Sequence, residues 1–221
     1  MQFKPYDDYF KPKPVLRNPE RENEVIERLK THIPENYIFD PSRVRPEEYE
    51  KILSFMARYK LWKKGEVSKP EKGLFICGVS GTGKTLIAAI LASELEIGFY
   101  CMLDIDEMGA RNREDVWDLP EISSRDSSIV IDDVGAESGL KSYGNEAITR
   151  SLWLRLYDDW AFRGKIAIVT ANLTLNQTEQ ARNSPRSVLN VLGDRAESRF
   201  CEMFEIVRFD GTDYRKEKMG E

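Results

Sequence analysis

A glycine-rich segment at residues 78–85, Gly-Val-Ser-Gly-Thr-Gly-Lys-Thr, has the residue types and spacing of a loop that binds phosphate groups. Its glycines allow successive backbone N–H groups to point inward around an anion, at the positive end of the following helix. We expect Lys84 to reach the β- and γ-phosphates of a nucleotide, and Thr85 to offer its hydroxyl to Mg²⁺. The predicted phosphate-binding residues are Gly78, Val79, Ser80, Gly81, Thr82, Gly83, Lys84 and Thr85.

Two adjacent carboxylates, Asp132 and Asp133, follow a short apolar segment at residues 128–131. Ligands bind at the carboxyl ends of strands in open parallel sheets, so these side chains are expected at such an end. We expect Asp132 to hold Mg²⁺ through water and Asp133 to orient or deprotonate an attacking water. The same two residues would also fit a solvated acidic turn. The presence of a phosphate loop in the same chain favours the interpretation as a metal site.

Further polar candidates are Asn172 and two arginines. Asn172 follows the apolar segment at residues 166–170 and is suited to position a water between Asp133 and a γ-phosphate, although asparagine also commonly starts a loop. Arg195 and Arg199 are four residues apart, hence on one face of a helix. Paired arginines are usually solvated or salt-bridged, so the residues alone give them no role.

The elements that position these side chains alternate along the chain. Short apolar segments are separated by helical patterns at residues 85–96, 145–162 and 187–200, which predicts a parallel sheet with helices on both faces. The fold class is therefore α/β, with five strands at residues 74–77, 99–103, 128–131, 166–170 and 204–208.

The region before the phosphate loop has a different character. Residues 1–33 form a proline-punctuated arm followed by a short charged helix at residues 20–30, which we expect Pro34 to end. A second helix is expected from Pro46, running into a polar linker at residues 63–73.

The amino-acid composition restricts the functions and the cellular compartment expected for this protein. A net charge of −5, with 32% charged residues, excludes a uniformly basic nucleic-acid binder, so any DNA contact must be a local patch. Three scattered cysteines and one histidine indicate reduced, buried thiols rather than disulfides or a zinc site. The first residues have no apolar signal core and no segment is apolar enough to span a membrane, so we expect a cytoplasmic protein with no membrane contact.

Two stretches of the sequence contain the basic residues expected of a contact with single-stranded DNA. One contains Arg111 and Arg113; the other, residues 59–72, places Trp62 among lysines. Such residues are able to combine phosphate neutralisation with base stacking. Both stretches also contain acids, and a solvated helix end explains them equally well.

Five motifs together resemble the DnaC-type bacterial helicase loaders and the related IstB-type transposition helpers, both AAA+ ATPases. They are GVSGTGKT, IVIDDVGAE, IVTANL, GDRAESRF and DGTDYR, and the resemblance extends over about residues 34–215. It implies a P-loop NTPase fold in which the helical lid is absent or much reduced. It also implies the cofactors ATP and Mg²⁺, a homo-oligomeric ring or spiral, and a replicative helicase or a transposase, with single-stranded DNA, as partners.

The resemblance also implies roles for individual residues. Asp132 and Asp133 would form the Walker B pair and Asn172 the sensor amide. Arg199 would be an arginine finger acting on the neighbouring subunit's ATP, and Arg215 a second sensor. Residues 34–221 would then be the ATPase domain, and residues 1–33 a segment that docks a partner.

Three departures from the family pattern leave other functions open. Ser80 stands where the family usually has proline, the N-terminal segment is shorter than the loaders' helicase-binding domain, and residues 174–185 form a longer segment. A small-molecule kinase would share the phosphate loop but need an acceptor site and an arginine-rich lid. A non-hydrolysing nucleotide switch is the remaining alternative if Asp133 is misplaced. GTP is not expected, because the sequence has no N-K-x-D motif.

Overall fold

A computed structural model describes residues 15–119, 122, 128–135, 145–172, 194–211 and 213–217. Three sequence predictions fall wholly or partly outside these ranges, and the first of them is the proline-punctuated arm, of which residues 1–14 are not described. The other two are the long segment at residues 174–185 and the first part of the helix predicted at residues 187–200.

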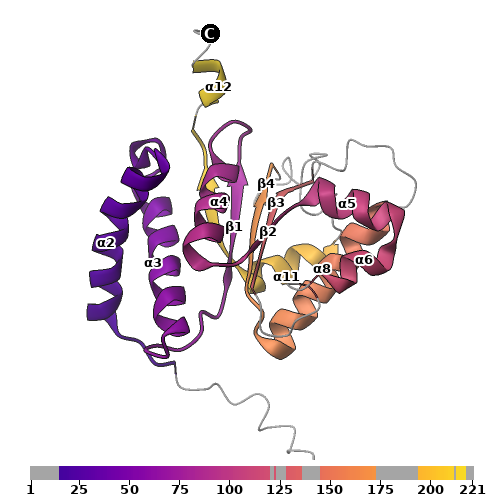
Figure 1. Cartoon of the computed structure of the whole chain (residues 1–221), viewed down its shortest axis with the longest axis horizontal. Helices are drawn as coiled ribbons and strands as arrows, with labels where there is room; N and C mark the ends of the chain where they lie inside the picture. Colours follow the sequence, from indigo (N-terminus) through magenta and orange to yellow (C-terminus); the bar gives the residue numbers. More distant parts are fainter. Residues whose placement is uncertain are drawn as a thin grey trace, which may run out of the picture.

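The centre of the molecule is a five-stranded sheet in the order β2-β3-β4-β1-β5, and every neighbouring pair is parallel. The five-stranded parallel sheet predicted from the sequence is thus confirmed. Because β1, β4 and β3 are neighbours, the segments that follow them meet at the same carboxyl edge (Figure 1). The strands are β1 (Gly73–Gly78), β2 (Gly98–Cys101), β3 (Ile129–Val134), β4 (Ala167–Ala171) and β5 (Phe204–Phe209).

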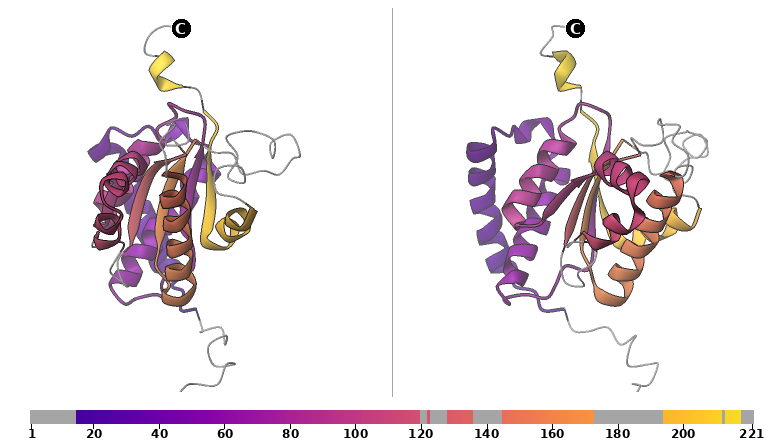
Figure 2. Two further views of the ribbon diagram at one scale, coloured as in Figure 1. Left: turned by 90° about the vertical axis from the view of Figure 1, so that its right-hand side faces the viewer. Right: turned by 45° about the vertical axis from the view of Figure 1, so that its right-hand side comes forward.

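Helices cover both faces of the sheet, because successive side chains of a buried strand point to opposite faces (Figure 2). Leu74 and Ile76 of β1 pack with α2 (Pro19–Tyr37), α3 (Pro46–Lys63) and α4 (Lys84–Leu95). Phe75 and Cys77 belong to a second cluster on the other face. The helices on that face are α5 (Met102–Arg111), α6 (Arg113–Asp118), α8 (Asn145–Arg163) and α11 (Asp194–Met203).

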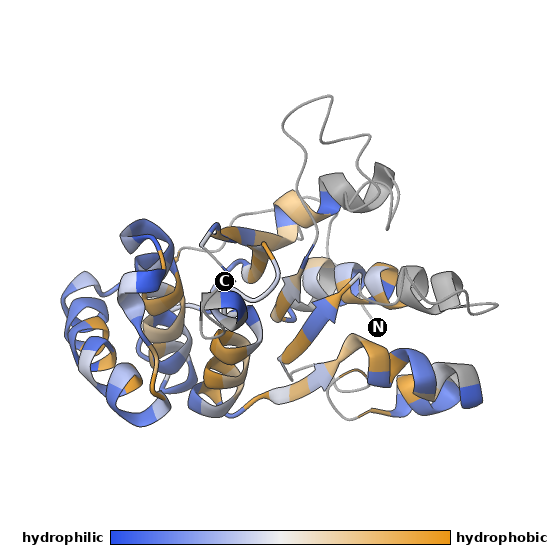
Figure 3. Ribbon diagram, turned by 90° about the horizontal axis from the view of Figure 1, so that it is seen from above, coloured by the Kyte–Doolittle hydropathy of each residue, from blue (hydrophilic) through white to orange (hydrophobic). Residues whose placement is uncertain are grey.

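Apolar residues follow this layering. Figure 3 shows hydrophobic colours on much of the sheet and on α4, and mainly hydrophilic colours on the outer helix α2. None of the helices in the described ranges is long and apolar enough to cross a bilayer.

The prediction that Pro34 ends the first helix is wrong. Helix α2 continues through Pro34 to Tyr37. A proline inside a helix removes one backbone hydrogen bond, but here Ile33 is fully buried and the Tyr37 hydroxyl donates to Glu94 Oε1 at 2.8 Å. These contacts hold the last turn of α2 against the neighbouring helices.

Two strand boundaries also differ from the prediction. β2 ends at Cys101 rather than residue 103, because Met102 starts α5 and is fully buried there. β3 extends to Val134, so Asp132 and Asp133 lie within the strand rather than after it.

The cysteines are free, as expected, but their predicted burial is only partly correct. Cys77 is buried, Cys101 is half-buried, and Cys201 is exposed. Burial raises the pKa of the Cys77 thiol to about 11, so this group beside the phosphate loop is protonated at neutral pH.

Helix α2 contributes core residues, so replacing Ile33 by alanine should lower the free energy of unfolding by about 2–5 kcal/mol. Asn23→Ala on the exposed side of the same helix should change it by no more than about 0.5 kcal/mol. Urea unfolding followed by circular dichroism measures both. Equal stability of the two variants would show that α2 does not contribute to the hydrophobic core.

Candidate nucleotide-binding site

The phosphate loop joins the end of β1 to the start of α4, as predicted. Gly81 and Gly83 have φ angles of +80° and +91°, in the left-handed region that side chains disfavour. At Gly81 a Cβ atom would also lie 1.8 Å from the Asp213 carboxylate. Both positions therefore require glycine, for backbone conformation at Gly83 and for conformation and space at Gly81.

Lys84 lies across this loop rather than in solvent. It is only 6% exposed, and its Nζ donates to the carbonyl oxygens of Gly78 at 3.1 Å and Val79 at 2.6 Å. The Thr82 hydroxyl donates to the same Val79 carbonyl at 2.8 Å. The loop is thus held closed around the ammonium group by its own backbone.

A β-bulge shapes the acidic end of the site. The pairing of β3 with β4 shifts between Ile131 and Val134, and within this shift Asp133 adopts a φ of +59°. Such a conformation is costly for a residue with a side chain and persists only where its surroundings hold it. Bulges frequently occur beside active sites, where they redirect a side chain.

Thr170 of β4 holds the bulge. Its hydroxyl accepts a hydrogen bond from the Asp133 backbone N–H at 2.8 Å and donates to Asp132 Oδ1 at 2.5 Å. Thr170 is 1% exposed and Asp132 is 5% exposed. Sequence reasoning did not select Thr170, although a hydroxyl in an otherwise apolar strand was the available signal.

Asn172 completes this group. Its Nδ2 donates to Asp133 Oδ1 at 2.9 Å. Its Oδ1 is buried and has no hydrogen-bond partner in the part of the chain that the structure describes. Buried amide oxygens normally accept a hydrogen bond. This oxygen is therefore able to accept one from a donor such as a water.

A cavity of about 310 Å³ joins the phosphate loop to the acidic group. Asp133, Thr170 and Asn172 line it together with Lys84 and Thr85. The structure therefore brings together the loop, one carboxylate and the amide that the sequence analysis selected. Asp132 lies beneath Thr170 instead of in the wall of the cavity.

The C-terminal segment supplies another wall, which sequence reasoning missed. Tyr214, at the start of α12 (Tyr214–Glu217), lines the cavity and donates its backbone N–H to the Gly81 carbonyl at 3.1 Å. Its hydroxyl donates to the carbonyl of Arg43, in the short helix η1 (Pro41–Arg43), at 3.1 Å. The Arg43 guanidinium lies 4.5 Å from the centre of the tyrosine ring. This stacked pair fixes the C-terminal segment over the loop.

Arg199 is not part of this cavity. It lies on α11 with its guanidinium carbon 4.3 Å from the centre of the Tyr157 ring on α8. Its Nη1 is buried with no hydrogen-bond partner among the described residues. The side chains of Arg195 and Arg215 lie outside the described part of the structure.

The oxygen donors near the loop fit Mg²⁺, which usually takes one or two carboxylates and completes its shell with water and substrate phosphates. The Thr85 hydroxyl lines the cavity, whereas the Asp132 carboxylate lies beneath Thr170 and would act on such an ion through a water. Among the described residues there is no group of three or more His, Cys, Asp or Glu side chains able to form a metal cage by itself. The chemistry of the site therefore suits an ion that arrives with phosphate groups.

Comparison with known proteins shows that the fold of this chain is similar to those of several solved structures. No protein-family model and no curated protein matches the chain. Among solved structures, the DnaC helicase loader shares 18% identity at a TM-score of 0.52, over 75% of this chain and 92% of that one. DnaI shares 18% identity at a TM-score of 0.52, over 81% and 92% of the two chains.

The replication initiator DnaA, in a structure bound to AMPPCP and single-stranded DNA, is also similar. It shares 17% identity at a TM-score of 0.55, and the match covers 92% of this chain but only 55% of the DnaA chain. This chain has an α/β P-loop NTPase fold. Its structural neighbours agree with the motif resemblance to DnaC-type AAA+ proteins.

Replacing Thr170 by valine keeps the volume of the side chain but leaves the Asp133 N–H and the Asp132 carboxylate without their partner. We expect a loss of about 1–3 kcal/mol in the free energy of unfolding, the usual cost of unsatisfied buried polar groups. Thr170→Ser keeps the hydroxyl and should lose less. Urea titration compares the three proteins, and a valine variant as stable as the wild type would refute this role of the hydroxyl.

Proposed function

We propose that this chain is a DnaC-like AAA+ ATPase that binds ATP with Mg²⁺ and hydrolyses it. We further propose that it acts in DNA replication, as a helicase loader or primosome-type component working on a replicative helicase and single-stranded DNA. The observation that carries the ATPase proposal is the Asp133–Asn172 hydrogen bond of 2.9 Å in the wall of the phosphate-loop cavity. A carboxylate and an amide at that place are suited to hold a water against a γ-phosphate.

Each residue of the cavity has a role in this proposal. The Lys84 ammonium exchanges its two bonds to loop carbonyls for bonds to phosphate oxygens. Asp133 accepts a proton from the attacking water or orients it. The Asn172 amide oxygen, which has no hydrogen-bond partner among the described residues, accepts a second hydrogen bond from that water. Thr85 and Asp132 would hold Mg²⁺, which supplies positive charge to the β- and γ-phosphates.

Arg199 is proposed to act on the ATP of a neighbouring subunit. It lies outside the cavity of its own chain, and it retains a guanidinium nitrogen without a hydrogen-bond partner among the described residues. An arginine finger in trans lies outside the cavity of its own chain, and Arg199 would have to turn its buried Nη1 outward to reach the ATP of another subunit. The proposal therefore includes a homo-oligomeric ring or spiral, with Arg215 as a second sensor of the nucleotide.

An IstB-like transposition helper is the alternative that shares all of these residues. It differs in its partner, so purified replicative helicase and purified transposase from the same host, each immobilised separately, distinguish the two functions. A non-hydrolysing switch is the other alternative, and it would bind ATP without releasing phosphate.

Two substitutions separate binding from hydrolysis. Lys84→Ala should weaken ATP binding, because the lost cation faces the most highly charged part of the nucleotide. Asp133→Asn should keep binding and stop hydrolysis, because the amide cannot accept the proton of the water. Binding of a fluorescent ATP analogue and release of inorganic phosphate measure the two effects. Equal loss of affinity in both variants would contradict the assigned roles.

Mixing inactive variants tests whether Arg199 acts between subunits. An arginine finger typically accelerates phosphoryl transfer by roughly 10³ to 10⁵, so Arg199→Ala should bind ATP but hardly hydrolyse it. When it is mixed with Lys84→Ala, one protein offers an intact phosphate loop and the other an intact finger. Phosphate release should then partly recover.

The control is each variant alone at the same total concentration. Mixed assemblies must first be demonstrated by size-exclusion chromatography of differently labelled proteins. If co-assembled variants recover no activity, Arg199 is not a finger in trans, and the same mixture with Arg195→Ala tests the neighbouring arginine.

A further inference from the structure

A short segment that begins at the last residue of β5 lies against the phosphate loop (Figure 1). We define it as the strap, residues 209–211 and 213–214. The Phe209 carbonyl accepts a hydrogen bond from the Val79 N–H at 3.3 Å, and the Tyr214 N–H donates to the Gly81 carbonyl at 3.1 Å. The strap is therefore bonded to the loop at two points, one at each of its ends.

The strap also occupies the space beside the loop glycines. A Cβ atom at Gly78 would lie 2.1 Å from the Phe209 carbonyl oxygen, and one at Gly83 would lie 3.6 Å from the Tyr214 ring. Both glycines belong to the predicted phosphate-binding residues. The shape of the loop around a phosphate group therefore depends on a neighbouring segment as well as on the loop itself.

The strap is held in turn by the segment that follows α2. The Tyr214 hydroxyl donates to the Arg43 carbonyl at 3.1 Å, and the Arg43 guanidinium lies 4.5 Å from the centre of the Tyr214 ring. Asp40 forms an ion pair with this guanidinium at 3.0 Å. Arg45 forms a second link to the strap, with its Nη2 2.9 Å from Asp210 Oδ2. Contacts thus run from residues 40–45, through the strap, to the phosphate loop.

We propose that the strap sets how long a bound nucleotide remains in the cavity, and that Tyr214 and Arg43 are the positioning residues through which it acts. The inference rests on the proposed function only in that the cavity binds a nucleotide, and it does not require hydrolysis. A loop that is already held in its binding shape loses less conformational freedom when a ligand binds, which strengthens binding. Differences in affinity between variants of one site appear mostly in the dissociation rate. The closed strap should therefore slow release of the nucleotide.

Arg43 acts through Tyr214 in this proposal. Tyr214 lines the cavity, whereas Arg43 is not among the described residues that line it. The tyrosine joins the two sides, because its N–H bonds to the loop while its ring and hydroxyl contact Arg43. Loss of the Arg43 guanidinium should therefore loosen the tyrosine first and, through it, the loop.

The effect should also act in the opposite direction. If the position of residues 40–45 changes the affinity for a nucleotide, a bound nucleotide must stabilise the contacts of these residues by the same free energy. Residues 40–45 connect α2 to α3. A bound nucleotide should accordingly fix the connection between these two helices.

The test measures dissociation of a fluorescent, non-hydrolysable ATP analogue from the full chain with Mg²⁺, by stopped flow after mixing with excess unlabelled ATP. Arg43→Met removes the charged group over the ring, and dissociation should become about 2–5-fold faster. Tyr214→Phe keeps the ring and loses one hydrogen bond, which should give an increase of about 2–10-fold. Tyr214→Ala loses both contacts and should release the analogue faster than either. Association rates should change little.

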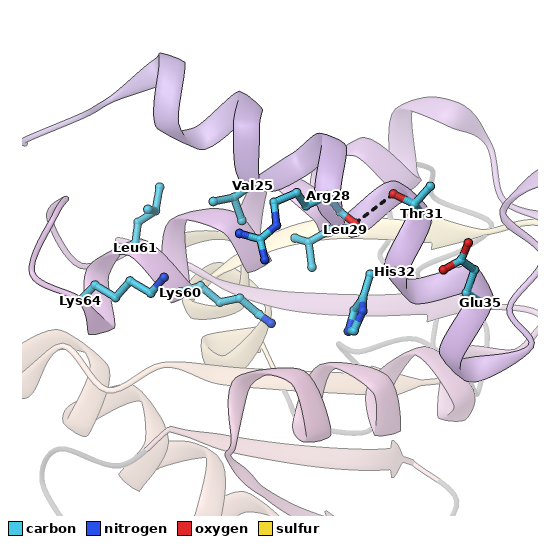
Figure 4. Close-up of a pocket in the computed structure, with 9 residues that line it drawn as sticks. All are labelled: Val25, Arg28, Leu29, Thr31, His32, Glu35, Lys60, Leu61 and Lys64. Carbon is cyan, nitrogen blue, oxygen red and sulfur yellow. Dashed lines mark hydrogen bonds between the residues drawn. The ribbon is translucent and has the colours of Figure 1, made fainter.

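The matched control is Arg28→Met, the same substitution at a residue away from the strap. Arg28 lines a hollow of about 570 Å³ between α2 and α3, together with His32 and Lys60 (Figure 4). None of the described residues that line this hollow belongs to the strap or to the phosphate loop. Arg28→Met should therefore release the analogue at the wild-type rate.

A double variant tests whether Arg43 acts through the tyrosine. If it does, adding Arg43→Met to Tyr214→Ala should cause no further acceleration, because residues that act through one contact have non-additive effects. Hydrogen exchange of residues 39–45 is the second measurement. The analogue should slow exchange there in the wild type but not in Tyr214→Ala, an effect that a merely structural role of Tyr214 would not produce.

Several results would overturn the proposal. They are wild-type dissociation rates in both Arg43→Met and Tyr214→Ala, equal acceleration in Arg28→Met, or fully additive effects in the double variant. Thermal unfolding of each variant excludes loss of the fold as the cause of faster release. If Tyr214→Ala does not fold, Tyr214→Phe and Arg43→Met still decide the question.

Phosphate release from ATP by the same proteins separates this proposal from the proposed function. If the wild type binds the analogue, the variants release it faster and no ATP is hydrolysed, the ATPase function fails while the role of the strap stands. If ATP is hydrolysed but the variants release the analogue at the wild-type rate, the reverse holds. A chain that binds no nucleotide would overturn both.

Discussion

The candidate site depends on one hydroxyl group, that of Thr170. It accepts the backbone N–H of Asp133 and donates to the carboxylate of Asp132, so a single group on β4 orients two consecutive carboxylates on β3. The bulge that these bonds stabilise directs the Asp133 side chain into the cavity, where it contacts Asn172. Without the hydroxyl, the Asp133 N–H and the Asp132 carboxylate would each lose a hydrogen bond that supports the bulge.

Helix α4 has polar contacts at both of its ends. Its first residue, Lys84, holds the phosphate loop, and Glu94, at its other end, holds Lys60 and His32 of the hollow between α2 and α3. One side of this helix is buried, whereas Thr85, Leu86, Ala89 and Ser93 are exposed on the other. It extends from the nucleotide cavity at Lys84 to the hollow between α2 and α3 at Glu94.

The sequence was sufficient for the features that depend on local pattern. The phosphate loop has fixed spacing, and the five apolar segments identify the strands to within a few residues. The bulge was not predictable, because it arises from the register of β3 against β4, two segments more than thirty residues apart in the chain. The path of α2 through Pro34 was missed for the same reason, since burial of Ile33 by other helices outweighs the local effect of proline. The wall formed by Tyr214 and Arg43 likewise joins segments from opposite ends of the sequence.

ATP hydrolysis is tested by measuring the release of inorganic phosphate from ATP by the unmodified chain, with Mg²⁺ or with EDTA, and with or without oligo-dT. We predict release that requires Mg²⁺ and yields ADP and phosphate without any small phosphorylated acceptor. If the chain binds ATP tightly, assembles, and still releases no phosphate in the presence of Mg²⁺ and DNA, it is not an ATPase. The cavity would then be that of a nucleotide switch.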